Sequence, residues 1–187
     1  RAEAAADWLL RLREAPNDHS LLDQWLKWCA EDVDNLIDYM NVIFYTGDED
    51  APLSRPLSNN RSNNWFGLRN RNGDEGFRFF LHDAEQTMIS KHNVGGLQGD
   101  RTGPFNNSNK GNFTYSNPQW IHEDLMEGSE EYRVRFGDRV HKHYFNGGAL
   151  STEAVTARFD ARAAELDTAV VAQSARWGNG AGQNPSF

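Results

Sequence analysis

Phe77-Arg78-Phe79-Phe80-Leu81-His82-Asp83-Ala84-Glu85 decides the fold, because this apolar run has the character of a buried strand and ends in two carboxylates. In an extended backbone, side chains two residues apart share one face of the strand. Asp83 and Glu85 are therefore predicted to point the same way from the end of the strand. Carboxylates placed in this way can hold a cation, so the end of the strand is a candidate metal site.

The residues before this strand complete a predicted β-hairpin. Residues 65–69 are expected to form the outgoing strand, 70–76 the turn and 77–81 the returning strand. Asn63-Asn64 precedes the hairpin, and the acidic cluster Asp48-Glu49-Asp50 stands upstream in a long polar loop. Loops of this length without regular structure are often functional.

Helices are expected on both sides of the hairpin, which predicts an α+β fold that is predominantly helical. Apolar spacing places these helices at residues 3–14, 20–28, from 32 to a stop at Gly47, 117–128, from 129 to a stop at Gly147, and 152–177. In the last helix, the residues predicted to face inward are Val155, Phe159, Leu166 and Val170. Residues 86–116 are rich in Gly, Asn and Ser, show little periodicity and are expected to form a long irregular segment.

Composition favours one domain over residues 1–178, followed by a frayed tail at 179–187. The net charge is −8, and no stripe of Lys and Arg with interleaved aromatic residues is present, which argues against nucleic acid as a partner. No run of sequence is apolar enough to span a membrane. The single cysteine, Cys29, excludes an internal disulfide and a thiolate zinc site, and is expected to be a buried structural thiol.

The order of the polar residues matches that of a phosphoryl-transfer site of the protein-kinase type. Such a site needs an Asp that orients the acceptor hydroxyl, an Asn for metal, and a hairpin that leads to a metal-binding Asp. Asp50, or Asp48, is the candidate base. Asn64, or Asn63, is the candidate metal-binding amide, and Asp83 is the principal metal carboxylate.

Several segments together resemble bacterial members of the spore coat protein H (CotH) kinase family. The resemblance spans roughly residues 20–178 and rests on Asp34-Asn35-Leu36-Ile37-Asp38-Tyr39-Met40, Asn63-Asn64-Trp65-Phe66, residues 77–85, Ser116-Asn117-Pro118-Gln119-Trp120 and Ser174-Ala175-Arg176-Trp177-Gly178. It implies a protein-kinase-like fold whose members use ATP and Mg²⁺ or Mn²⁺ to phosphorylate proteins on Ser or Thr. It also implies a location at the spore coat or cell surface.

Carried over by position, the resemblance assigns Asp83 as the metal-binding Asp and Glu85 as its accompanying acid. Asn64 matches the Asn that follows the catalytic Asp, and Asp50-Ala51-Pro52 resembles the family's Asp-Trp-Pro with Ala in place of Trp. About ten residues are inserted between Pro52 and Asn63, whereas ordinary kinases keep about four residues between base and Asn. The loop must therefore fold back if Asp50 is to reach the site.

No Gly-rich phosphate loop and no phosphate-binding lysine stand in the helical patterns before the hairpin. The chain is therefore expected to be the carboxyl-terminal lobe of a longer kinase-like protein whose amino-terminal lobe is absent. On its own it is expected to bind ATP negligibly.

Each of these features has an alternative interpretation. The acidic cluster at residues 48–50 and the pair Asn63-Asn64 are also typical of a solvated loop and of turn residues. His82 is expected to stack in a partly buried position, and Trp120 and Trp177 are expected to anchor the core. As whole functions, the alternatives are a non-catalytic coat or cell-surface binding protein and, ranked lower, a glycosidase that uses Asp83 and Glu85.

Overall fold

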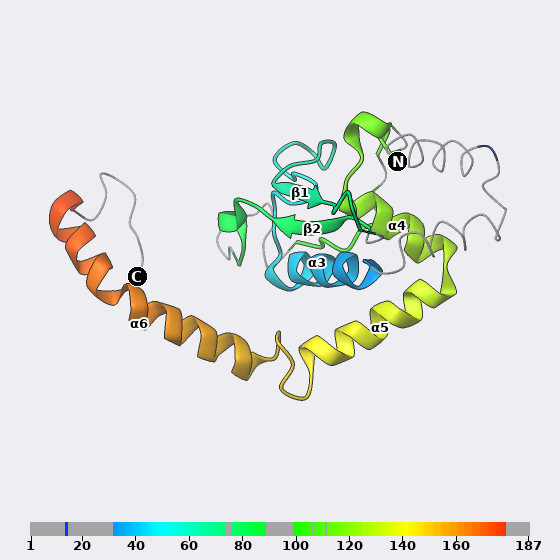
Figure 1. Cartoon of the computed structure of the whole chain (residues 1–187). Helices are drawn as coiled ribbons and strands as arrows, with labels where there is room; N and C mark the ends of the chain where they lie inside the picture. Colours follow the sequence, from blue (N-terminus) through cyan, green and yellow to red (C-terminus); the bar gives the residue numbers. More distant parts are fainter. Residues whose placement is uncertain are drawn as a thin grey trace. The chain divides into compact units, whose positions relative to one another are not determined.

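The computed structural model describes residues 14, 32–73, 76–88, 99–105, 107–110 and 112–178. The helices expected at 3–14 and 20–28, the environment of Cys29 and the tail at 179–187 lie outside these ranges, apart from Glu14. The chain divides into two compact units, Arg1–Arg139 and Val140–Phe187, and each unit is described by itself. Figure 1 shows the described helices and strands in chain order.

Helix α3 (Val33–Thr46) carries the core of the first unit. The buried side chains return every three or four positions, which gives the helix one continuous apolar face: Val33, Leu36, Ile37, Met40 and Ile43. The helix ends at Gly47, whose φ of 60° is a left-handed conformation that glycine adopts without a steric penalty. The predicted helix and its stop are confirmed.

Strands β1 (Trp65–Leu68) and β2 (Arg78–Leu81) form the predicted antiparallel hairpin, with Trp65 opposite Leu81 and Phe66 opposite Phe80. The hairpin lies against α3 in Figure 1. Asn35 of α3 joins the two elements, because its side chain accepts a hydrogen bond from Phe79 N at 2.6 Å and donates one to Phe79 O.

The described residues cover only one face of the hairpin, and the prediction of a buried strand is wrong for β2, whose residues are exposed or half-buried. Phe79 and Trp65 pack against the core that α3 carries. Phe66 and Phe80 lie on the other face, where their rings stack on each other and remain 43% and 39% exposed. An apolar run cannot distinguish a strand that is buried on both faces from one that exposes an aromatic pair.

Helices α4 (Pro118–Gly128) and α5 (Glu130–Tyr144) follow the predicted pattern. Asn117 caps α4 by accepting a hydrogen bond from Trp120 N at 3.3 Å, and α4 packs on α3 with Trp120 and Leu125 buried. The prediction that Trp120 anchors the core is confirmed.

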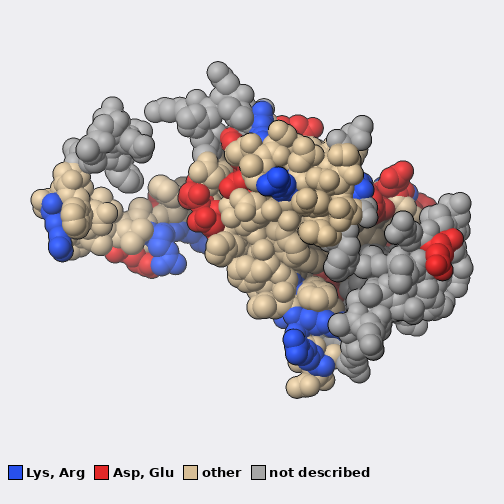
Figure 2. Space-filling model, turned by 90° about the horizontal axis from the view of Figure 1, so that it is seen from above, with Lys and Arg blue, Asp and Glu red and all other residues tan. Residues whose placement is uncertain are grey.

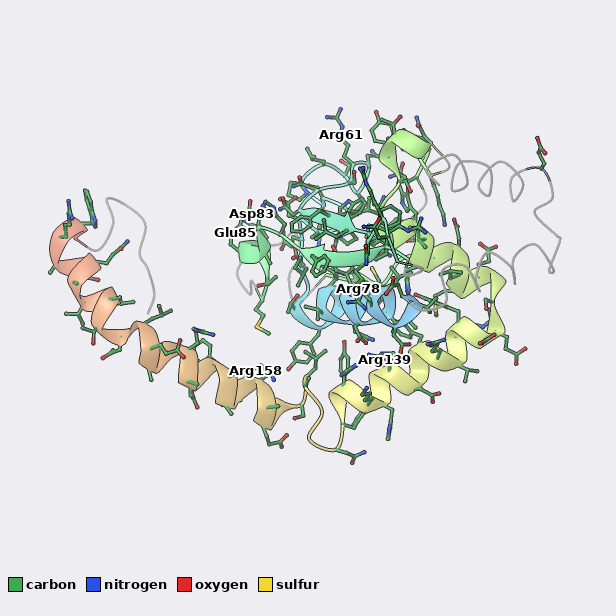
Figure 3. The ribbon with its side chains drawn as sticks, in the orientation of Figure 1. Arg61, Arg78, Asp83, Glu85, Arg139 and Arg158 are labelled. Atoms are coloured by element: carbon green, nitrogen blue, oxygen red, sulfur yellow. The ribbon has the colours of Figure 1, made fainter. Side chains whose placement is uncertain are left out.

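An ion-pair network joins α5 to α3 in the first unit. Arg139 donates to both carboxylate oxygens of Asp38 and, at 2.8 Å, to Asp34, which also accepts from Arg135 at 2.7 Å. The Arg139 side chain is only 16% exposed, and its planar fork matches a carboxylate in two-point contact. In Figure 3 it is labelled beside α5.

Replacing Arg139 by methionine is expected to lower the free energy of unfolding by about 1–2 kcal/mol, because a partly shielded network is lost while the apolar stem is kept. Urea denaturation measures this change. The matched control is Arg162→Met, which removes an exposed pair with Glu165 and should cost less than about 0.5 kcal/mol. Equal losses in the two variants would contradict the expectation.

The second unit contains α6 (Thr152–Trp177), which is capped by Ser151, whose side chain accepts a hydrogen bond from Ala154 N at 3.3 Å. Its bounds agree with the prediction, but the inward orientation of its apolar residues is wrong, because α6 has no buried residue. Phe159 is 71% exposed and Trp177 is 68% exposed, so Trp177 is not a core anchor. Helical periodicity reveals an apolar face without revealing what covers it.

No described helix has the length and apolar character that a bilayer crossing requires.

Candidate active site

A tight turn at Asp48 follows α3 and begins the site. Asp48 is fully buried, and its Oδ1 accepts hydrogen bonds from Asp50 N at 2.9 Å and Ala51 N at 3.1 Å. Burial raises the pKa of Asp48, and the two backbone N–H groups oppose that rise. Glu49 is 5% exposed. The alternative of a solvated acidic loop is therefore wrong for Asp48 and Glu49.

The insertion that follows this turn closes on itself. We call residues 53–62 the excursion. Its ends are joined by the bridge between Leu53 and Ser62, and Asn63 N donates to Pro52 O at 3.0 Å. Residues 52 and 63 are thereby brought together at the base of the excursion, so the insertion does not separate Asp50 from Asn63 and Asn64.

Asp50 meets both asparagines at the base of the excursion. Its Oδ2 accepts hydrogen bonds from Asn63 Nδ2 at 2.9 Å and from Asn64 Nδ2 at 3.0 Å. Asn64 has a φ of 49°, a left-handed conformation that Asn tolerates better than most residues. Both side chains therefore have a specific partner and are more than turn residues.

Asn64 also contacts the segment after β2. Its Nδ2 lies 3.4 Å from Asp83 O, and its own carbonyl accepts a hydrogen bond from His82 N at 3.3 Å. Glu49 N donates to Gln86 O at 3.2 Å, which ties the same segment to the Asp48 turn. Asp50, Asn64 and Asp83 are thus brought to one place from three separate stretches of sequence.

Asp83 and Glu85 do not have the predicted extended geometry. Strand β2 ends at Leu81, Asp83 is left-handed with φ 52° and ψ 51°, and Glu85 lies in the short 3-10 helix η1 (Ala84–Gln86). The prediction that the two carboxylates share one face of a strand is therefore wrong. Both side chains are exposed. Figure 3 shows them together where the chain leaves β2 and enters η1.

His82 is exposed rather than partly buried. Its ring meets the ring of Phe66 edge-on, with 5.8 Å between the centroids, on the open face of the hairpin. The prediction of a stacked, partly buried histidine is therefore wrong, because the ring contact is edge-on and the side chain is exposed.

Arg101 is a site residue that sequence reasoning missed. It comes from the stretch 86–116 that showed little periodicity, yet it is only 4% exposed. Its Nη2 donates to Leu53 O at 2.6 Å and its Nη1 to Asn59 Oδ1 at 2.8 Å. Burial lowers the pKa of Arg101, and the nearby Asp48 opposes that effect. The sequence signal that could have indicated Arg101 is the acidic cluster at residues 48–50, because buried carboxylates favour a cation nearby.

The donor set suits a hard divalent cation. Because Asn64 Nδ2 points to Asp50, the oxygen Oδ1 is the atom that this amide can offer to a metal, and Asp83 and Glu85 add carboxylates. Among the described residues, no group of three or more His, Cys, Asp or Glu side chains is arranged to hold a metal. Mg²⁺ does not need such a group, because it is commonly held by one or two carboxylates with substrate phosphates and water.

Charge is mixed on the surface seen from above. Figure 2 shows the described Lys and Arg residues dispersed on that face, with Asp and Glu residues between them. The described part of this face therefore presents both signs of charge rather than one.

Comparison with known proteins gives one finding. The family model described as CotH kinase protein matches residues 24–186 of the chain. Neither the curated proteins nor the solved structures contain a significant match.

Proposed function

Because the chain belongs to the CotH kinase protein family, we propose that it is the part of an atypical protein kinase that holds the acceptor hydroxyl and the metal. The proposed reaction transfers a phosphoryl group from ATP to Ser or Thr of a protein, with Mg²⁺ or Mn²⁺. The observation that supports it most is the position of the Asn64 side chain between the Asp50 carboxylate and the Asp83 carbonyl.

Asp50 is the proposed base, and Asp48 has a supporting role. Oδ2 of Asp50 is held by two amides, and no hydrogen bond within the described residues engages its Oδ1. This oxygen can accept a hydrogen bond from the acceptor hydroxyl and orient it for in-line attack. Asp48 is buried and uses Oδ1 to fix the turn, so it is badly placed to meet a substrate.

Asn64 Oδ1, Asp83 and Glu85 are the proposed metal ligands. A bound divalent cation would neutralise charge that develops on the transferred phosphoryl group. The residues themselves hold a defined geometry, because Asp83 and Asn64 are both left-handed and joined by a hydrogen bond. Non-glycine residues in this conformation are uncommon and gather at functional sites.

Two other functions are alternatives to phosphoryl transfer. The glycosidase alternative rested on a strand that carries both carboxylates on one face, whereas Asp83 lies in a left-handed turn and Glu85 in η1. A non-catalytic binding protein of the coat or cell surface is supported by the exposed aromatic pair on the hairpin, Phe66 and Phe80. The proposed location at the coat or cell surface rests on family membership alone.

The full-length protein is expected to incorporate labelled phosphate from ATP only when Mg²⁺ or Mn²⁺ is present, and Asp83→Asn should abolish this incorporation because a carboxylate ligand is lost. Autophosphorylation, with and without a chelator, measures the effect. Asp138→Asn is the control, since this exposed carboxylate lies on α5 and has no part in the proposed site. Undiminished incorporation in Asp83→Asn would refute the assigned role, and no incorporation by the wild type would favour the binding protein.

A further inference from the structure

Residues 101–105 and 107–110, which we call the strap, cross the excursion and hold it. Asn109 Nδ2 donates to Asn60 O at 3.1 Å, and Asn107 Nδ2 donates to Asn59 O. Arg101 adds its contacts with Leu53 O and Asn59 Oδ1. Arg101 therefore joins Leu53, the first residue of the excursion, to Asn59, the seventh of its ten residues.

Helix α4 anchors the strap from the other side. The buried Glu123 accepts hydrogen bonds from Phe105 N at 3.0 Å and from Lys110 Nζ at 3.1 Å, and Gln119 donates to Thr102 O at 3.2 Å. The backbone of the strap comes closest to Glu123 at Gly103, where φ is 80° and an added Cβ would lie 2.6 Å from Glu123 Oε1. The strap is therefore fixed to a core helix at several points along its length.

The site depends on the base of the excursion staying closed. Asp50 reaches Asn63 and Asn64 because residues 52 and 63 lie side by side. That closure is held by the Leu53–Ser62 bridge and by two backbone hydrogen bonds at 3.0 Å, from Asn63 N to Pro52 O and from Ser54 N to Arg61 O. These few bonds close a loop whose middle residues include exposed ones. Closing a flexible loop costs entropy, so an additional tether should keep the geometry defined.

We infer that Arg101 is a positioning residue: it holds the base of the excursion closed and thereby keeps the Asp50 carboxylate against Asn63 and Asn64. Arg101 makes no hydrogen bond to these three side chains, so it acts through Leu53 and Asn59. The planar guanidinium suits this role, since two of its nitrogens bond two separate partners at once. Lysine has the charge without this geometry.

Nuclear magnetic resonance measures the geometry at the base of the excursion without an activity assay. In the ¹⁵N-labelled chain, the side-chain amide signals of Asn63 and Asn64 report their contact with Asp50. In Arg101→Met these signals are expected to move toward the positions that they have in Asp50→Ala. Arg133→Met is the matched control, because Arg133 also donates to backbone carbonyls, those of Met126 and Glu127, and these lie at the end of α4. The control should leave both amide signals at their wild-type positions.

A second variant keeps the test valid if Arg101→Met does not fold. Asn59→Gly removes one acceptor of Arg101 and suits the left-handed φ of 52° at this position. It is expected to shift the same amide signals by a smaller amount. The inference is overturned if the amide signals of Asn63 and Asn64 keep their wild-type positions in folded Arg101→Met. If Arg101→Met does not fold, unchanged signals in Asn59→Gly overturn it.

Steady-state kinetics measures the effect of Arg101 on catalysis, and this prediction rests on the proposed function. In the full-length protein, Arg101→Lys is expected to lower kcat by about tenfold or more and to change KM for ATP by less than about twofold, because a displaced base slows chemistry without touching the nucleotide. A merely structural role would lower thermal stability and leave kcat of the folded enzyme unchanged. Inactive wild-type protein would refute the proposed function, while the amide signals would still decide the role of Arg101.

Discussion

Asp50→Asn in the full-length protein is expected to lower kcat for phosphoryl transfer by about 10²–10⁴-fold, the range that a positioned acid–base group contributes. Asparagine retains a side-chain oxygen that can accept hydrogen bonds from Asn63 and Asn64, so the fold and the base of the excursion should persist. What is lost is the negative charge that orients the acceptor hydroxyl. Steady-state kinetics with a fixed protein substrate and varied ATP measures the effect, and KM for ATP should change little.

Asp48→Asn distinguishes the two candidate bases. Asparagine at this position retains an acceptor for Asp50 N and Ala51 N, so the turn is kept, and a buried carboxylate is replaced by a neutral group. This variant should lose far less activity than Asp50→Asn. If Asp48→Asn is the more damaging of the two while remaining folded, the base has been assigned to the wrong residue. Asp138→Asn, an exposed change on α5, serves as the control for charge alone.

The parts of the fold that the sequence predicts well are those specified by local signals. Helix α3 has an apolar face at helical spacing and a glycine where the chain turns left-handed, and the Asn117-Pro118 pair sets the start of α4. The hairpin has two short apolar runs around a polar turn. In each case the residues that determine the element lie inside it or next to it.

The end of the hairpin was predicted wrongly because distant contacts determine it. The pattern at 77–85 favours an extended backbone, but Asp83 turns left-handed where its carbonyl meets the Asn64 amide. That contact joins residues 19 positions apart. The burial of Asp48 has a similar origin, because the opposite charge near it is Arg101 from a segment with little periodicity.

The closed excursion shows how the proposed site accommodates the long stretch of chain between Asp50 and Asn63. A kinase-type site needs its base and its metal-binding Asn at a fixed separation, and about four residues ordinarily provide it. Here ten residues, 53–62, leave and return at the same place, so the separation at the base does not depend on the length of the excursion. In the inferred arrangement Arg101 supports this closure from outside the motif, so the motif alone does not determine the position of Asp50.

Acidification is expected to destabilise the protein through His122, by up to about 3 kcal/mol between pH 6.5 and about pH 4. His122 is 4% exposed, its Nδ1 lies 2.8 Å from the Tyr132 hydroxyl, and the rings of Phe44 and Phe136 surround it. Burial in this setting lowers the pKa of His122 from 6.5 to about 4. Between these two values the imidazole takes up a proton in the unfolded chain and remains neutral in the folded one.

Because the unfolded state binds more protons in this window, the free energy of unfolding falls as pH is lowered through 6.5 and its His122 contribution levels off below about pH 4. Urea denaturation at several pH values measures the slope. In His122→Gln that part of the slope should disappear, whatever the variant does to stability at neutral pH, while the exposed His141→Gln should retain the wild-type slope. If His122→Gln and the wild type lose the same free energy on acidification, carboxylates elsewhere in the chain, and not His122, cause the acid sensitivity.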